Sequence, residues 1–162
     1  MTDSKNPLPS SAQRVADAAQ RLGLTPKIVT MADSTRTAEE AAAACGCEVG
    51  HIVKSLVFRG ASSGQPYLLL VSGKNRVDEK KAAKVIGEAL ARPDAAYVRG
   101  TTGFAIGGIP PFGHAEPLKT YLDADLLTYG DVWTAAGTPH CVMQLSPRDL
   151  QAKTEAVTIE VY

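Results

Sequence analysis

The sequence has no excess of either charge, no long apolar run and no leader-like beginning. Its 17 lysines and arginines balance its 17 aspartates and glutamates. This balance excludes a protein that coats nucleic acid nonspecifically, because such proteins need a large basic excess, although it leaves room for a local basic patch. No apolar run approaches membrane-spanning length, so we expect no membrane partner. The opening residues, MTDSKNPLPSS, lack both the apolar core of a secretory signal and an arginine-rich amphipathic pattern.

The few cysteines fit neither a metal site nor a redox motif. Cys45 and Cys47 are separated by one residue, unlike the C-x-x-C motif, and Cys141 stands alone. An odd number of cysteines without a signal peptide indicates reduced thiols in the cytoplasm. We therefore expect a cytoplasmic protein with three buried, unreactive cysteines, and neither a metal nor a cofactor.

A length of 162 residues suits one domain with a substantial core. We expect residues 1–9 to form a flexible N-terminal tail and residues 10–162 to form the domain. Apolar periodicity and end signals, including a capping box of Thr37 with Glu40, predict helices over 10–22, 37–45, 78–90 and 147–153. Apolar and β-branched runs predict strands over 27–31, 52–59, 66–72, 95–99, 118–122, 131–135, 140–145 and 157–162.

These elements predict a mixed α/β (α+β) fold, with a largely antiparallel sheet flanked by helices. The runs 52–59 and 66–72 are apolar on both faces, which indicates an antiparallel hairpin at the centre of the sheet.

Lys54 is the exception in the first of these strands. Strand alternation places it on the face of Ile52, Leu56 and Phe58. Such a lysine either reaches solvent from the end of a strand or holds its ammonium toward a polar cavity. The pattern alone favours solvent, because lysine is rarely fully buried.

The stretch TTGFAIGGIPPFGH, residues 101–114, combines four glycines and the pair Pro110-Pro111 with large apolar side chains. A segment both apolar and irregular must place its backbone amides on protein, water or a ligand. We interpret it as a rigid pocket wall whose Gly107 and Gly108 amides face a bound molecule. A buried turn between two strands fits the composition equally well. The stretch is not a phosphate-binding loop, because no lysine-serine or lysine-threonine pair closes it.

A basic cluster precedes and covers the helix predicted over 78–90. It consists of Lys74, Arg76, Lys80, Lys81 and Lys84. Such a run is usually a solvated face, but it can also contact phosphates.

The order and spacing of these segments resemble the YbaK/ProX family, free-standing relatives of the editing domain inserted in bacterial prolyl-tRNA synthetases. The resemblance covers roughly residues 25–155. It rests on HIVKSLVF, SGKNRVDEKKAAKVIG, TTGFAIGGIPPFG and DVWTAAGTPHCVMQLSPRDL.

The resemblance implies a trans-editing deacylase, which hydrolyses the ester bond between a wrong amino acid and the 3′ end of a tRNA. It implies contact with the acceptor end of the aminoacyl-tRNA, with prolyl-tRNA as the expected carrier and prolyl-tRNA synthetase as a possible partner. The expected amino acids are small, such as alanine, cysteine, serine or threonine.

The resemblance also implies roles for particular residues. Lys54 would orient the phosphate-ribose end or support catalysis, with the Gly107 and Gly108 amides and His140 as further catalytic groups. The expected substrate-binding residues are Ile106, Ile109, Pro110, Pro111, Phe112, Gly113, Asp123 and Gly137. The expected tRNA phosphate contacts are Lys74, Arg76, Lys80, Lys81 and Lys84.

The nucleophile is expected to be water or the ribose 2′-hydroxyl, because the sequence has no G-x-S-x-G elbow and no Ser-His-Asp set. Loop amides would stabilise the oxyanion. Cys141 and His140 are neighbours on a predicted strand, so they point to opposite faces and do not form a catalytic pair. A non-catalytic module that binds aminoacyl-tRNA or a synthetase, and a small-molecule esterase, remain the alternatives.

Overall fold

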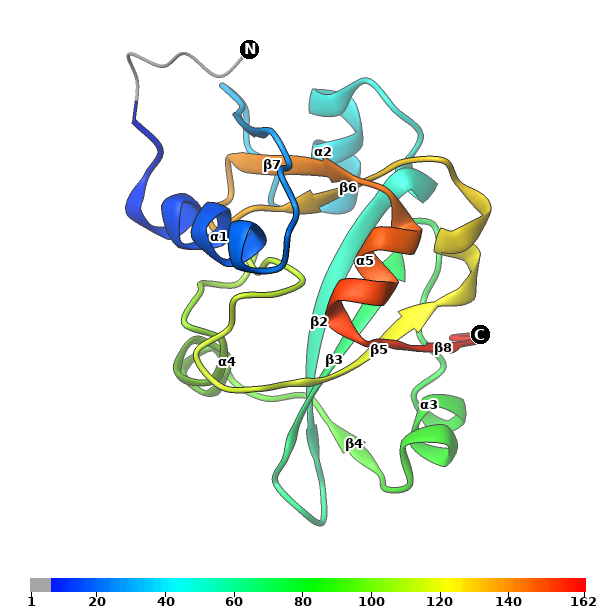
Figure 1. Ribbon diagram of the computed structural model, residues 1–162. Helices are drawn as coiled ribbons and strands as arrows, with labels where there is room; N and C mark the ends of the chain where they lie inside the picture. Colours follow the sequence, from blue (N-terminus) through cyan, green and yellow to red (C-terminus); the bar gives the residue numbers. More distant parts are fainter. Residues whose placement is uncertain (1–6) are drawn as a thin grey trace.

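The computed structural model describes residues 7–162. They form one mixed sheet of eight strands in the order β1-β7-β6-β2-β3-β5-β8, with β4 also paired to β2 (Figure 1). The strands are β1 Ile28–Thr30, β2 Ile52–Gly60, β3 Pro66–Ser72, β4 Leu90–Ala91, β5 Lys119–Asp123, β6 Val132–Ala135, β7 Cys141–Leu145 and β8 Val157–Ile159. The helices are α1 Ser10–Arg21, α2 Ala38–Cys45, α3 Glu79–Ile86, α4 Ala95–Thr102 and α5 Pro147–Thr154, with 3₁₀ turns at Val49–His51 (η1) and Ala124–Thr128 (η2).

The expected mixed fold is confirmed. Antiparallel pairs join β1 to β7, β6 to β7, and β2 to both β3 and β4, whereas β2 with β6, β3 with β5, and β5 with β8 are parallel. The predicted hairpin of β2 and β3 runs through the middle of the molecule (Figure 1). Both faces of β3 are covered: Leu68 and Leu70 belong to the core cluster that includes α1, and Leu69 and Val71 belong to the one that includes Ala82 of α3.

Three predicted elements differ in the structure. The strand expected over 95–99 is helix α4, since the Asp94 side chain accepts a hydrogen bond from the Tyr97 amide at 2.8 Å and caps a helix start. The helix expected to reach residue 90 ends at Ile86, because Gly87 adopts a left-handed conformation with φ 103°. The following residues form β4 on the edge of β2. The closing strand expected over 157–162 is only three residues long.

Part of the N-terminal prediction lies outside the described residues, since the expected tail spans residues 1–9. Of the described part, residues 7–9 have no regular structure and Leu8 packs against the main core.

The expectation of three buried cysteines is right only for Cys141. Cys45, the last residue of α2, and Cys47, just after its Gly46 cap, are half-buried. Partial burial, together with a smaller effect of the neighbouring Cys47, raises the pKa of the Cys45 thiol to about 11. The thiol of Cys45 is therefore protonated at neutral pH and a poor nucleophile.

The middle of β2 has a strand neighbour on one side only. β3 pairs with β2 from Val53 to Arg59. On the other side, β6 pairs only with Ile52 and Val53, and β4 pairs only with Arg59 and Gly60. The sheet therefore has a gap beside Lys54–Phe58.

Candidate active site

Lys54 lies at this gap and lines a cavity of about 540 Å³. Its side chain is half-buried, and its ammonium donates a hydrogen bond to the main-chain carbonyl of Asn75 at 2.5 Å. Of the two alternatives that the sequence left open, the structure therefore shows the lysine at a cavity rather than extended into bulk water. Gly107 and Arg36 line the same cavity.

The surroundings of Lys54 change its acidity. Burial lowers the pKa of the ammonium, and Arg76 lowers it further, while Glu39 and Asp123 oppose the change. A lysine whose pKa is lowered releases a proton more readily than an exposed lysine does. Lys54 is therefore suited both to stabilise negative charge and to give a proton to a leaving oxygen.

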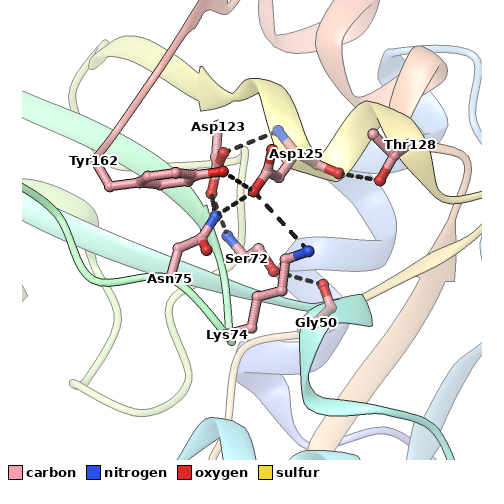
Figure 2. A network of polar contacts seen from close by, with 8 residues as sticks. All are labelled: Gly50, Ser72, Lys74, Asn75, Asp123, Asp125, Thr128 and Tyr162. Atoms are coloured by element: carbon pink, nitrogen blue, oxygen red, sulfur yellow. Dashed lines mark hydrogen bonds and ion pairs between the residues drawn. The ribbon is translucent and has the colours of Figure 1, made fainter.

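Asn75 is held in place by two carboxylates, those of Asp123 and Asp125, which Figure 2 shows joined to its side-chain nitrogen. Its side-chain nitrogen donates to Asp123 Oδ2 at 2.8 Å and to Asp125 Oδ2 at 2.9 Å. Asp123 also accepts from the Ser72 amide at 3.1 Å. The hydroxyl of Tyr162, the last residue of the chain, donates to Asp125 at 2.8 Å. This network fixes the residue whose carbonyl binds the Lys54 ammonium.

Asp123 was expected among the substrate-binding residues, but it does not line the Lys54 cavity. Asp123 is buried, with a residue exposure of 1%. Its carboxylate accepts hydrogen bonds from the Ser72 amide, the Asn75 side chain and the Asp125 amide. Asp123 therefore acts on the site indirectly, by holding Asn75, whose carbonyl binds Lys54.

The glycine-proline stretch contributes its first half to the cavity. Ile106, Gly107 and Ile109 line it, and Ile106 remains 47% exposed at its mouth. Gly107 adopts φ 95°, and a Cβ there would lie 2.6 Å from Cγ of Arg36. Among the described residues, the Gly107 amide has no hydrogen-bond acceptor. It is a free backbone donor on this wall.

Gly108 has a different position from the one its expected role requires. Its amide donates to the Ala105 carbonyl at 3.0 Å, so it is engaged within the turn. Its carbonyl accepts from the Gly137 amide at 2.9 Å, and a Cβ at Gly108 would lie 2.8 Å from the Thr138 backbone. Gly108 and Gly137 therefore fasten the loop to the turn between β6 and β7, and neither lines the cavity.

The second half of the stretch lies elsewhere. Pro111, Phe112 and Gly113 line a separate hollow of about 560 Å³ next to α1, and Pro110 is buried and lines neither cavity. His114 lies beside Pro111 in that hollow, with Nε2 2.7 Å from the Pro110 carbonyl, and burial lowers the pKa of its imidazole. The structure does not bring these residues to Lys54.

No histidine of the sequence lines the Lys54 cavity, and all three lie within the described residues. His140 is exposed, with Nδ1 3.2 Å from the Asp33 carbonyl. His51 has Nδ1 3.1 Å from the Asp131 carbonyl. The catalytic position expected for His140 therefore requires substrate to reach beyond the cavity rim.

The predicted phosphate contacts separate into two groups. Lys74 and Arg76 line the Lys54 cavity. The other three are on α3, where Lys81 donates to the Tyr162 carbonyl at 2.6 Å and to Glu160 at 3.3 Å. Lys80 and Lys84 are exposed.

Several cavity residues were missed by sequence reasoning, among them the polar residues Arg36, Ser55 and Asn75. Arg36 directly precedes the capping box of α2, and Asn75 lies inside the basic segment, so neither stands out by residue type. The Ser55 hydroxyl is buried and, among the described residues, is the one such side-chain atom without a hydrogen-bond partner. Only the fold brings the three together.

Comparison with known proteins identifies the fold and family. The model of the aminoacyl-tRNA editing domain matches residues 32–153. The chain belongs to this family. A solved structure described as a candidate trans-editing enzyme for prolyl-tRNA synthetase superposes with a TM-score of 0.90 at 50% identity, covering 96% of this chain and 98% of the other.

Two curated bacterial relatives agree. YwhH of Bacillus subtilis, an uncharacterised protein, is 34% identical over 117 residues, which are 72% of this chain and 74% of YwhH. EbsC of Enterococcus faecalis, named as a candidate Cys-tRNA(Pro)/Cys-tRNA(Cys) deacylase, is 31% identical over 129 residues, which are 77% of this chain and 76% of EbsC. The family resemblance stated from the sequence is thus confirmed.

Residues 7–162 contain no helix long and apolar enough to cross a membrane. They also contain no group of three or more histidine, cysteine, aspartate or glutamate side chains arranged to hold a metal ion.

Proposed function

We propose that this editing domain hydrolyses the ester bond of mischarged tRNA, with the Lys54 cavity as its active site. The observation that carries the proposal is the meeting of a half-buried ammonium and a free loop amide, Gly107, on one cavity. Ester hydrolysis develops negative charge on the carbonyl oxygen, and donors placed around that oxygen stabilise the transition state.

The chemistry needs no protein nucleophile. The oxygen of a water molecule, or of the ribose 2′-hydroxyl, attacks the ester carbon, and the bond from that carbon to the 3′-oxygen breaks. The leaving 3′-oxygen gains a proton from the Lys54 ammonium, and the attacking oxygen releases its proton to solvent, from which the Lys54 amine is protonated again. If the 2′-hydroxyl attacks, the acyl group moves to the 2′-oxygen and water must then release it. Asn75 keeps the ammonium directed through its carbonyl.

The acceptor end of the tRNA would approach across Lys74 and Arg76 at the cavity mouth. Both are exposed cations, and Arg76 has no ion pair among the described residues. Binding that uses them should weaken as salt concentration rises. Lys80 and Lys84 of α3 are candidates for contacts further along the strand.

The names of the relatives support tRNA(Pro) as the carrier and a small amino acid as the group removed. Cysteine, alanine, serine and threonine are the candidates that we propose to compare. We further propose that the protein works in the cytoplasm beside prolyl-tRNA synthetase, whose errors it would correct.

A panel of mischarged tRNAs tests the proposal. Alanyl-, cysteinyl-, seryl- and threonyl-tRNA(Pro) are incubated with the protein, and the remaining ester is measured over time. Release of at least one amino acid well above the buffer rate is expected. Binding without release for every ester would refute the hydrolase and favour a non-catalytic tRNA-binding module. Release from simple amino-acid esters but not from tRNA would favour a small-molecule esterase.

A further inference from the structure

The gap in the sheet leaves part of the β2 backbone without a strand partner. The Ile52 carbonyl accepts from the Gly73 amide at 2.7 Å, and the Gly60 amide donates to the Gln65 carbonyl at 2.8 Å, so both residues direct their polar groups toward β3. The register between β2 and β3 is unbroken from Val53 to Arg59. Strand alternation therefore turns the polar groups of Ser55 and Val57 away from β3, into the gap.

The C-terminal end of β2 shows the same alternation of backbone polar groups. Arg59 pairs with Ala91 of β4, and the Ala61 amide donates to the Ala89 carbonyl at 2.8 Å, so odd-numbered residues face the side of the gap. Within the described residues, neither the Ser55 nor the Val57 amide donates to an acceptor outside the sheet ladder. Backbone groups in this position need water or a ligand as partner.

The gap is also a trough. A second cavity, of about 480 Å³, follows residues 54–58. It shares six lining residues with the cavity described above: Lys54, Ser55, Leu56, Arg76, Ile106 and Ile109. Its other lining residues are apolar except for Arg92, and they include Val77, Pro93 and Val98.

Along one edge of a strand, the carbonyl of one residue lies next to the amide of the residue two positions later. Ser55 and Val57 thus present an acceptor and a donor side by side. The Watson–Crick edge of adenine carries the matching groups, an N6 amino donor beside the N1 acceptor, and its flat apolar faces suit apolar walls. Since the esterified ribose would lie at Lys54, its attached base must lie within one nucleoside length of that side chain.

We propose that the open edge of β2 binds the terminal adenine of the tRNA, with the Ser55 carbonyl accepting from N6 and the Val57 amide donating to N1. This inference rests on the proposed function, because it assigns a place to the nucleoside that carries the ester. Both hydrogen bonds to the base come from main-chain groups. Main-chain recognition does not depend on particular side chains, so residue types alone do not indicate this site.

The first test replaces the terminal adenosine of a mischarged tRNA(Pro) by purine riboside, which lacks the N6 amino group, or by 1-deazaadenosine, which lacks N1. Each change removes one hydrogen bond, and kcat/KM should fall about five- to tenfold. Equal rates for all three termini would overturn the inference while leaving the hydrolase intact. If no terminus is hydrolysed, the proposed function has failed, and the binding measurement below decides the inference separately.

The binding measurement uses adenosine 5′-monophosphate and ¹⁵N-labelled protein. The amide signals of Ser55 and Val57 should shift on titration, more than with purine riboside monophosphate, while the amide of Leu68 in the covered strand β3 stays unchanged. Shifts confined to the separate hollow at Gly113 would overturn the assignment.

A pair of variants isolates the Val57 amide. Val57→Pro removes this donor at a position that faces away from the ladder, where proline is tolerated in strands, and Val57→Ala is the matched control that keeps it. Val57→Pro should lose the preference for adenosine over 1-deazaadenosine, which Val57→Ala should retain. A folded Val57→Pro protein that keeps the full preference would overturn the inference. If it does not fold, the titration of the unmodified protein still decides.

Discussion

Replacing Lys54 by methionine separates the catalytic value of its ammonium from its effect on folding. Methionine keeps an unbranched side chain and removes the charge and the hydrogen bond to the Asn75 carbonyl. Loss of one preorganised donor at a developing oxyanion costs about 10²–10³ in rate. We therefore expect kcat for the best mischarged tRNA to fall by that factor, with a smaller change in KM.

The free energy of unfolding should change little in the same variant. The lost hydrogen bond destabilises by about 1 kcal/mol, while removal of a half-buried charge whose pKa is lowered by burial acts in the opposite direction. The net change should therefore stay within about 1 kcal/mol by urea denaturation. Lys27→Met, at an exposed lysine before β1, is the matched control and should keep wild-type rate and stability.

The pH dependence of stability gives the sign of the Lys54 effect. Below the lowered folded pKa, the ammonium is charged in both states and burial makes the folded state less favourable. Between that pKa and the ordinary value of 10.5, the unfolded chain binds the extra proton, so stability should rise with pH in that window. Lys54→Met should lack this rise. Full activity in Lys54→Met, or a rate loss that follows unfolding, would refute the reasoning.

Two further predictions concern the supports of the site, and a third concerns the turn of the β2–β3 hairpin. Asn75→Ala should lower both the thermal midpoint and kcat, because it leaves two carboxylates without their shared donor; unchanged values in both would contradict the network. Gly108→Ala should destabilise by about 1–3 kcal/mol in urea, because its Cβ would lie 2.8 Å from the Thr138 backbone; a stability equal to wild type would show that the loop can move. Hydrogen bonds from the hairpin turn lower the pKa of Glu88 from 4.5 to about 2, so its stabilising effect is present above pH 4.5 and is lost as pH falls toward 2. Glu88→Gln should have a lower thermal midpoint than wild type at pH 6, and the difference should shrink at pH 2; a constant difference would argue against the assignment.

Much of the fold could be predicted because its signals are local. Both hydrogen bonds of the predicted capping box between Thr37 and Glu40 are present, and the apolar runs of β2 and β3 form the expected central hairpin. Helix α4 was missed because its start depends on a single side chain, Asp94, before a short segment with strand-like composition. β4 is a two-residue strand, too short for any periodicity to indicate.

The candidate site could be predicted in part for the same reason. Lys54 stands out as a charge in an apolar strand, and Gly107 belongs to a segment of unusual composition. The division of that segment could not be predicted, because Gly107 and Gly113 lie in the same glycine-proline stretch and both have positive φ angles, yet they line different cavities. Asn75 could not be predicted either, because its importance arises from carboxylates about 50 positions away in the chain.

The site exists because β2 is longer than the strands that pair with it on the side of β6 and β4. A continuous neighbour would have satisfied Ser55 and Val57 and closed the trough. The glycine-proline stretch faces this opening with Ile106, Gly107 and Ile109, while Gly108 fastens it through the Gly137 amide. Its glycines therefore serve two physical purposes: Gly107 supplies a free amide donor at a positive φ, and Gly108 allows close backbone packing. Substitution of Gly107 should reduce both activity and stability, because of its φ of 95° and the nearby Arg36 side chain, whereas substitution of Gly108 should act mainly on stability.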